Sequence, residues 1–106
     1  MVYHFTCTCR RCGYAAADIE FGANSGSGIR KVPVLNKLRK SVDSIVLENQ
    51  ITGLGDSIIP YTSRRLKSLF AFISDRTSYA DLQNKINAHN NLCPRCSTYN
   101  LSFITS

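Results

Sequence analysis

Four cysteines, arranged in two Cys-x-x-Cys pairs, are the residues of this sequence best suited to chemistry. One pair, Cys9 and Cys12, lies near the start, and the other, Cys93 and Cys96, lies near the end. A two-residue gap lets a tight turn direct both thiolates at one ion, and structural zinc takes four such ligands. We therefore expect one structural zinc ion bound by Cys9, Cys12, Cys93 and Cys96.

The spacer between the pairs is long for a small zinc site. Eighty residues separate Cys12 from Cys93. Loop closure costs about 0.6 kcal/mol more for each doubling of length, so the extra length costs roughly 1 to 1.5 kcal/mol. Structural zinc binding contributes on the order of 10 kcal/mol. The length of the spacer therefore does not argue against one shared site.

Three other residues are possible ligands. Cys7 lies two positions before Cys9, and its alternative role is that of a small buried residue on the apolar face of a strand. His4 and His89 are single histidines, which are more often surface or core side chains than ligands. The matching spacing of the two pairs favours the four cysteines over these three residues.

The segments around the cysteines resemble the zinc-ribbon class. Residues 5–14 (Phe-Thr-Cys-Thr-Cys-Arg-Arg-Cys-Gly-Tyr) look like a first rubredoxin-like knuckle, and residues 92–97 (Leu-Cys-Pro-Arg-Cys-Ser) look like a second. Together with the strands expected beside the two knuckles, the resemblance covers about a third of the chain. It implies two knuckles that clamp zinc beside a small antiparallel sheet. It leaves the partner open, because members of this class bind DNA, RNA, ribosomes or other proteins.

The sequence argues against catalysis. A glutaredoxin-like redox pair must open a helix with sheet beyond it, and ten residues follow Cys96. A nucleobase deaminase needs His-x-Glu, and neither His4 nor His89 is followed by Glu at that spacing. Four cysteines on one zinc ion leave no open position for a reacting water. The glycine-rich stretch 22–28, expected to be a mobile loop, lacks the Lys that a phosphate-binding loop requires.

Alternating apolar and polar side chains predict strands near both termini. The three alternating segments are residues 2–8, about 17–21 and 98–104, and their period is that of a half-buried strand. The residues expected to face inward are Tyr3, Phe5, Cys7, Ala17, Ile19, Phe21, Tyr99, Leu101 and Phe103.

Between the knuckles the pattern favours helices. We expect one helix from Pro33 to a stop at Gly53 and Gly55, and a second over about 62–74. A third opens with Ser78 as its N-cap and ends at 90–91. The residues expected to face inward are Leu35, Leu38, Val42, Ile45, Val46 and Asn49 in the first helix, Leu66, Leu69, Phe70 and Ile73 in the second, and Tyr79, Leu82, Ile86 and His89 in the third.

These elements define the expected fold class. At 106 residues the chain has the size of one domain, 1–106. We predict an α+β fold: a small three-stranded antiparallel zinc ribbon formed by the two termini, with a helical insertion of about three helices at about 30–91. No apolar run is long enough to cross a bilayer, and no signal peptide is visible. Together with five cysteines and metal binding, this predicts a cytoplasmic protein without a membrane partner.

Charge points to an acidic partner. Lys and Arg number 13 against 7 Asp and Glu, a formal charge of +6. Four thiolates and one zinc ion would lower it to about +4. The candidate nucleic-acid contacts are Arg10, Arg11, Arg30, Lys31, Lys37, Lys40, Arg64 and Lys67, and we expect the last six in a loop and on two outer helix faces. Such charges often serve only solvation, and Arg10, Arg11 and Arg95 could simply offset the charge of the thiolates.

The predicted function is that of a non-catalytic, zinc-stabilised module that binds nucleic acid, such as DNA, or a nucleoprotein assembly, and that has no small-molecule substrate. The alternative is a protein-binding role: an adaptor, an inhibitor or a structural subunit, such as one encoded by a phage. Exposure of Phe70, Phe72 and Ile73 would favour that alternative. Tyr14, Tyr61 and Tyr99 are candidates for stacking on bases, although core packing explains them equally well.

Overall fold

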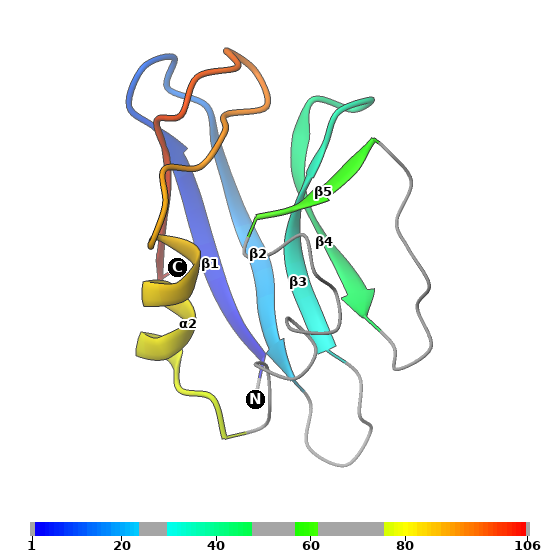
Figure 1. Cartoon of the computed structure of the whole chain (residues 1–106), viewed down its shortest axis with the longest axis vertical. Coiled ribbons are helices and arrows are strands. Elements are labelled where there is room, and N and C mark those ends of the chain that lie inside the picture. Colours follow the sequence, from blue (N-terminus) through cyan, green and yellow to red (C-terminus); the bar gives the residue numbers. More distant parts are fainter. Residues whose placement is uncertain (1, 24–29, 48–56, 62–75, 106) are drawn as a thin grey trace.

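The computed structural model describes residues 2–23, 30–47, 57–61 and 76–105, and the strands within these ranges form one antiparallel sheet (Figure 1). The strand order is β4-β3-β2-β1-β6, and β5 pairs with β3 outside this path. The elements are β1 (Val2–Cys9), β2 (Ala15–Ala23), β3 (Arg30–Asn36), β4 (Ser41–Leu47), β5 (Ile58–Pro60), α2 (Tyr79–Ile86) and β6 (Leu101–Thr105).

The prediction of an α+β ribbon with a three-helix insertion is wrong, because the described part of the chain is mostly sheet. The segment expected to be a helix from Pro33 instead forms β3 and β4, which pair along their whole length. Residues 32–35 are all buried, so β3 is covered on both faces. A strand of this kind has a continuous apolar run instead of an alternation, and such a run also fits the periodicity of a buried helix.

In the β3–β4 hairpin, several side chains differ in exposure from what the predicted helix implied. Residues 37–40 form a turn, not a helix face. Leu38, expected to face inward, is 83% exposed in that turn. Val46 is also exposed on β4, whereas Leu35 and Val42 are buried as predicted. The predicted helix over 62–74, with Phe70, Phe72 and Ile73, lies outside the described residues.

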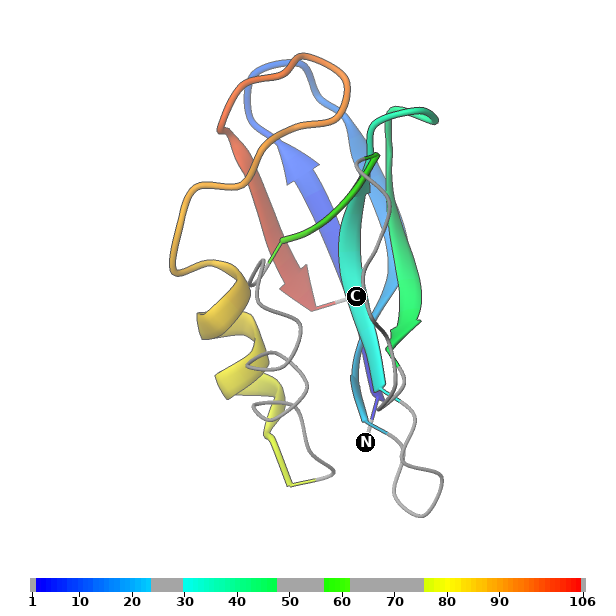
Figure 2. The same ribbon diagram turned by 45° about the vertical axis from the view of Figure 1, so that its right-hand side comes forward.

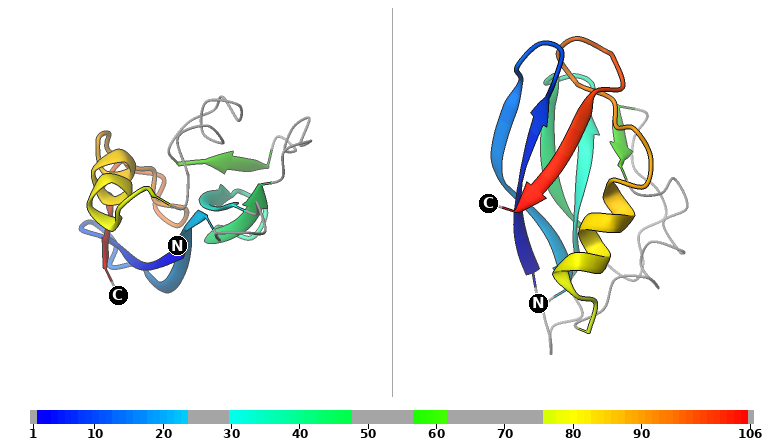
Figure 3. Two further views of the ribbon diagram at one scale, coloured as in Figure 1. Left: turned by 90° about the horizontal axis from the view of Figure 1, so that it is seen from below. Right: turned by 90° about the vertical axis from the view of Figure 1, so that its left-hand side faces the viewer.

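Pro33 marks the point where β3 changes its partner. The start of β3 pairs with β2, and its end, from Val34 onward, pairs with β5. Pro33 has no N–H to donate between these two pairings, and its carbonyl accepts a hydrogen bond from the Tyr61 N–H at 3.2 Å. Where β2 leaves β3, the Glu20 N–H donates to the Ser44 Oγ of β4 at 2.7 Å. The sheet therefore curls, and β5 and α2 lie on its open side (Figure 3).

The predicted strands at the termini are confirmed, with two changes. Phe5, Cys7, Phe21 and Phe103 are fully buried in the core. In β2 a bulge around Asp18, which has φ +59, shifts the register, so that Ala17 is exposed instead of buried. The last strand begins at Leu101, and Tyr99, expected to face inward, is 64% exposed in the loop before it.

The third predicted helix is confirmed as α2. The Ser78 hydroxyl accepts a hydrogen bond from the Asp81 N–H at 3.2 Å, and Leu82 and Ile86 are buried against the sheet (Figure 2). The helix ends earlier than predicted because Asn87 turns to the sheet: its side-chain amide donates to the Phe103 carbonyl at 2.7 Å and accepts from the Phe103 N–H at 3.0 Å. No helix within the described ranges is long and apolar enough to cross a membrane.

Candidate metal centre

Knuckle 1, residues 9–14, is the turn between β1 and β2. The Cys9 N–H donates to the Tyr14 carbonyl at 2.8 Å, and the Gly13 N–H donates to the Cys9 carbonyl at 3.1 Å. Gly13 has φ +79, a conformation that glycine adopts without a steric penalty. Backbone N–H groups, that of Cys12 above all, donate to the Cys9 sulfur and lower the pKa of its thiol. The turn therefore favours a thiolate at Cys9.

Knuckle 2, residues 93–98, precedes β6 and has the same backbone design. The Cys93 N–H donates to the Thr98 carbonyl at 2.8 Å, and the Ser97 N–H donates to the Cys93 carbonyl at 3.1 Å. Ser97 has the left-handed φ of +57 at the position equivalent to the glycine of knuckle 1. The Thr98 hydroxyl lies 3.0 Å from the Cys96 sulfur and is the main cause that lowers the pKa of Cys96 to about 6.

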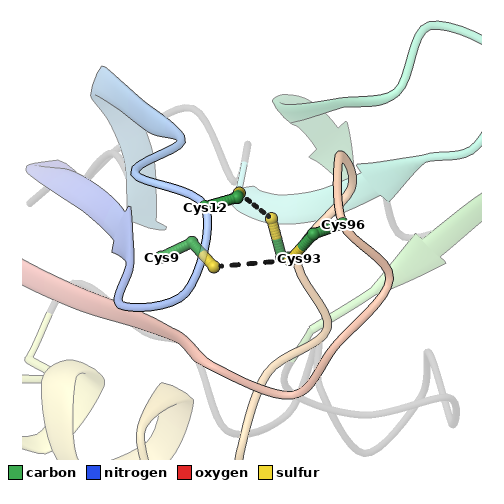
Figure 4. Close-up of side chains that lie close together, drawn as sticks. All are labelled: Cys9, Cys12, Cys93 and Cys96. Atoms are coloured by element: carbon green, nitrogen blue, oxygen red, sulfur yellow. Dashed lines mark hydrogen bonds between the residues drawn. The ribbon is translucent and has the colours of Figure 1, made fainter.

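The two knuckles face each other and bring the four predicted cysteines together (Figure 4). The Sγ atoms of Cys9 and Cys96 are 3.6 Å apart, and those of Cys12 and Cys93 are 3.5 Å apart. All four sulfurs lie within 4.8 Å of one another. A disulfide has its sulfurs about 2.05 Å apart, so these are free thiols.

This spacing fits a single metal ion. Sulfurs placed about 2.3 Å from a central ion at the corners of a tetrahedron are about 3.8 Å apart. Burial raises the pKa of the Cys93 thiol to about 12, which disfavours its ionisation while the site holds no cation. A divalent cation reverses this preference, because it binds the thiolate and releases the proton. The four cysteines are therefore arranged to hold a metal ion.

The other candidate ligands lie outside this cluster. Cys7 is fully buried in the core on β1, and burial raises its thiol pKa to about 11, as expected for a small apolar residue. His4 and His89 are both exposed. The Nδ1 atom of His4 lies 3.9 Å from the Asp18 Oδ1 atom. None of the three belongs to the group of four sulfurs.

Tyr14 connects the metal centre to the β3–β4 turn. Its hydroxyl accepts a hydrogen bond from the Val42 N–H of β4 at 3.1 Å. Its ring lies under the guanidinium of Arg95, with the central carbon 5.3 Å from the ring centroid. Tyr14 is buried in this position, so the stacking role considered for it from the sequence is not available. One side chain thus joins knuckle 1, knuckle 2 and the start of β4.

Positive charge collects at the end of the molecule that holds the knuckles. In Figure 1 the turn between β3 and β4 lies at the same end as both knuckles. We call the exposed cations of these three loops the basic end; they are Arg10, Arg11, Lys37, Arg39, Lys40 and Arg95. Loop residues 10–14, 37–40 and 93–97 contain no Asp or Glu.

Sequence reasoning missed Arg39 because it placed this residue within a helix. The signal that could have found it is the polar turn 36–41 between two segments rich in Val and Ile. The remaining predicted nucleic-acid contacts do not belong to the basic end. Arg30 and Lys31 begin β3, about 20 Å from its other end at 3.3 Å per residue, and the Lys31 Nζ is 2.8 Å from Glu20 Oε2. Arg64 and Lys67 lie outside the described residues.

No protein-family model matches this chain, and neither do the curated proteins or the solved structures that were compared with it. The likeness to the zinc-ribbon class is therefore carried by the two knuckles alone.

Proposed function

We propose that this protein is a non-catalytic, zinc-stabilised module that binds nucleic acid, free or within a nucleoprotein assembly, through the basic end. The observation that supports this proposal is that three loops distant in sequence lie at one end of the molecule and together carry six exposed cations. Asp43, the acidic residue that follows the β3–β4 turn, has both carboxylate oxygens engaged: Asn36 and Ser41 donate to them at 3.0 and 3.1 Å. Asp43 keeps its negative charge, and a zinc ion bound by four thiolates contributes about −2 to the same end of the molecule, so the six cations leave this end with a net charge of about +3.

Zinc is the ion that we assign to the centre. A tetrahedral set of four thiolates selects zinc or iron, and sulfurs as close as these leave room for one ion rather than a cluster. A closed shell of four cysteines has no open position for water, which supports a structural and not a catalytic role. The test is the metal content of the purified protein by plasma mass spectrometry. One zinc per chain is expected, and one iron per chain would overturn the assignment.

Phosphate binding makes a quantitative prediction about salt. Each phosphate neutralised by the protein contributes about −0.9 to the slope of log affinity against log salt concentration. If four to six of the basic-end cations contact phosphates, the slope for duplex DNA is about −4 to −5. With this slope, a fourfold rise in salt from 50 to 200 mM would lower the affinity by roughly a hundredfold or more.

The experiment is fluorescence anisotropy of a labelled duplex at several salt concentrations. Arg39→Ala and Lys40→Ala are each expected to reduce the magnitude of the slope by about 1. Lys85→Ala, a cation on α2, is the matched control and should leave the slope unchanged. Binding that ignores salt, or an equal loss in the control, would contradict the proposal. Recovery of a protein partner after nuclease treatment, without DNA or RNA binding, would instead support the adaptor or subunit alternative.

A further inference from the structure

The β3–β4 turn combines cations with an exposed apolar side chain at its tip. Its sequence is Lys37-Leu38-Arg39-Lys40, and all four residues are exposed. Leu38, at 83%, is the most exposed large hydrophobic residue among those the structure describes. A leucine in contact with water has no role in the core, and here it has a cation on each side in the sequence.

The turn is held in place by hydrogen bonds on both sides of Leu38. The Lys37 N–H donates to the Ser57 carbonyl at 2.8 Å, and the Arg39 N–H donates to the Asn36 Oδ1 at 3.1 Å. The Asn36 Nδ2 in turn donates to Asp43 at 3.0 Å. These contacts fix the backbone that carries Leu38, so little conformational entropy is lost when the side chain enters a binding site.

We propose that Leu38 is an apolar wedge that enters the minor groove of duplex DNA and partly unstacks one base step, while Lys37, Arg39 and Lys40 contact the phosphates beside it. This inference rests on the proposed function and names its partner. Proteins that bend DNA from the minor groove use this combination: an apolar side chain between base steps, with basic residues near the flanking backbone. The bend brings more phosphates towards the protein, which offsets the cost of unstacking.

Two other occupants fit the turn less well. Single-stranded nucleic acid is bound by stacking on aromatic rings, and leucine has no ring to offer. An anionic membrane needs a larger apolar area, because even a whole myristoyl chain gives only marginal binding and one leucine buries much less. Neither a single strand nor a membrane accounts for a leucine between cations in a turn that hydrogen bonds hold in place.

The inference predicts a sequence preference without base-specific hydrogen bonds. Pyrimidine–purine steps such as TpA unstack easily, whereas A-tracts are stiff. A duplex with central TpA steps should therefore bind more tightly than a duplex of equal length and composition with a central A-tract. We expect a difference of about fivefold or more, the lower end of what one altered base pair costs.

The test uses both duplexes, with a fluorophore pair on their ends so that bending is read as energy transfer. Wild-type protein should prefer the TpA duplex and increase its energy transfer. Leu38→Ala should lose the preference and the bending but keep a salt-dependent affinity. The contacts of Lys37, Arg39 and Lys40 with the neighbouring phosphates do not need the wedge, and only the phosphate contacts that the bend adds are lost. Ile104→Ala, which removes a similar side chain that is 51% exposed on β6, is the matched control and should behave as wild type.

Each contrary result has a distinct meaning. If wild type binds both duplexes with a salt-dependent affinity but without preference or bending, the wedge is wrong and the proposed function stands. If it binds neither duplex, nor a DNA single strand or an RNA of the same length, both are wrong. Binding to phosphatidylserine vesicles that Leu38→Ala abolishes, without duplex binding, would assign the turn to a membrane surface. Tighter binding to a single strand than to either duplex would also overturn the wedge, and would point to Tyr99 as a stacking residue.

Discussion

Knuckle 1 and knuckle 2 share their backbone hydrogen bonds but differ in what supports them. Knuckle 1 closes a hairpin, so its two strands, β1 and β2, pair directly on either side of it. Knuckle 2 has a loop and α2 before it, and it joins the sheet through β6, whose partner β1 lies at the other end of the chain. The first knuckle is thus a local structure, and the second depends on contacts between distant segments.

Burial differs in the same sense. The first cysteine of each knuckle, Cys9 or Cys93, is buried, but the second is exposed in knuckle 1 (Cys12) and half-buried in knuckle 2 (Cys96). Pro94 is also buried, whereas the equivalent Arg10 is exposed. Knuckle 1 has a glycine at the position that needs positive φ, and knuckle 2 has a serine there. The comparison indicates that local turn chemistry is enough to form the first half of the metal site, while the core positions the second half.

The largest expected effect comes from breaking the buried knuckle with Cys93→Ser. Three thiolates remain, and most of the zinc contribution, on the order of 10 kcal/mol, is lost. Since a domain of this size is stable by about 5–15 kcal/mol, cooperative unfolding should disappear together with bound zinc. Metal analysis and thermal melting measure both. Cys7→Ala, which removes a buried thiol outside the cluster, is the control and should keep one zinc; wild-type zinc affinity in Cys93→Ser would refute the shared site.

A smaller effect on stability is expected from substitutions at the positive-φ residue of each knuckle, Gly13 or Ser97. Gly13→Ala should destabilise the zinc-bound protein by about 1–2 kcal/mol, because a Cβ is strained at this φ although nothing lies within 4 Å of it. Ser97→Gly should be close to neutral, because relief of the strain is offset by the greater entropy of glycine in the unfolded chain. Urea denaturation at saturating zinc measures both changes. Equal effects in the two variants would mean that the knuckles do not differ in this respect.

The smallest expected effect is on zinc affinity and comes from removing the Thr98 hydroxyl, which lies next to the Cys96 sulfur. Thr98 lowers the pKa of Cys96 to about 6, so protons displace a metal from this sulfur only at lower pH. Thr98→Val should raise that pKa, shift acid-induced zinc release to higher pH and weaken zinc binding by about tenfold at neutral pH. A zinc-release titration with a chromogenic chelator measures it. Thr8→Val, next to knuckle 1, is the control; a shift to lower pH in Thr98→Val would contradict the role given to the hydroxyl.

The sequence predicted the elements whose signals are local. The two Cys-x-x-Cys pairs, the alternation in β1 and the N-cap of α2 each lie within about ten residues, and each was found in the structure. Prediction failed for β3 and β4, because the apolar run from Val32 to Leu35 is compatible with both a buried strand and a helix. The frequency of Val and Ile in that region favours strands. Hydrophobic periodicity does not include this preference for certain residue types.

By itself, the sequence determined the chemistry of the candidate metal site: four cysteines with knuckle spacing in a chain with an excess of positive charge. The tertiary structure decided which charges lie at the same end of the molecule, since Arg10, Lys37 and Arg95 are far apart in the chain and strand pairing brings their loops to one end. It also exposed Leu38. The physical reason is that turns and ligand spacing depend on neighbouring residues, whereas a surface depends on the path that the sheet imposes on the whole chain.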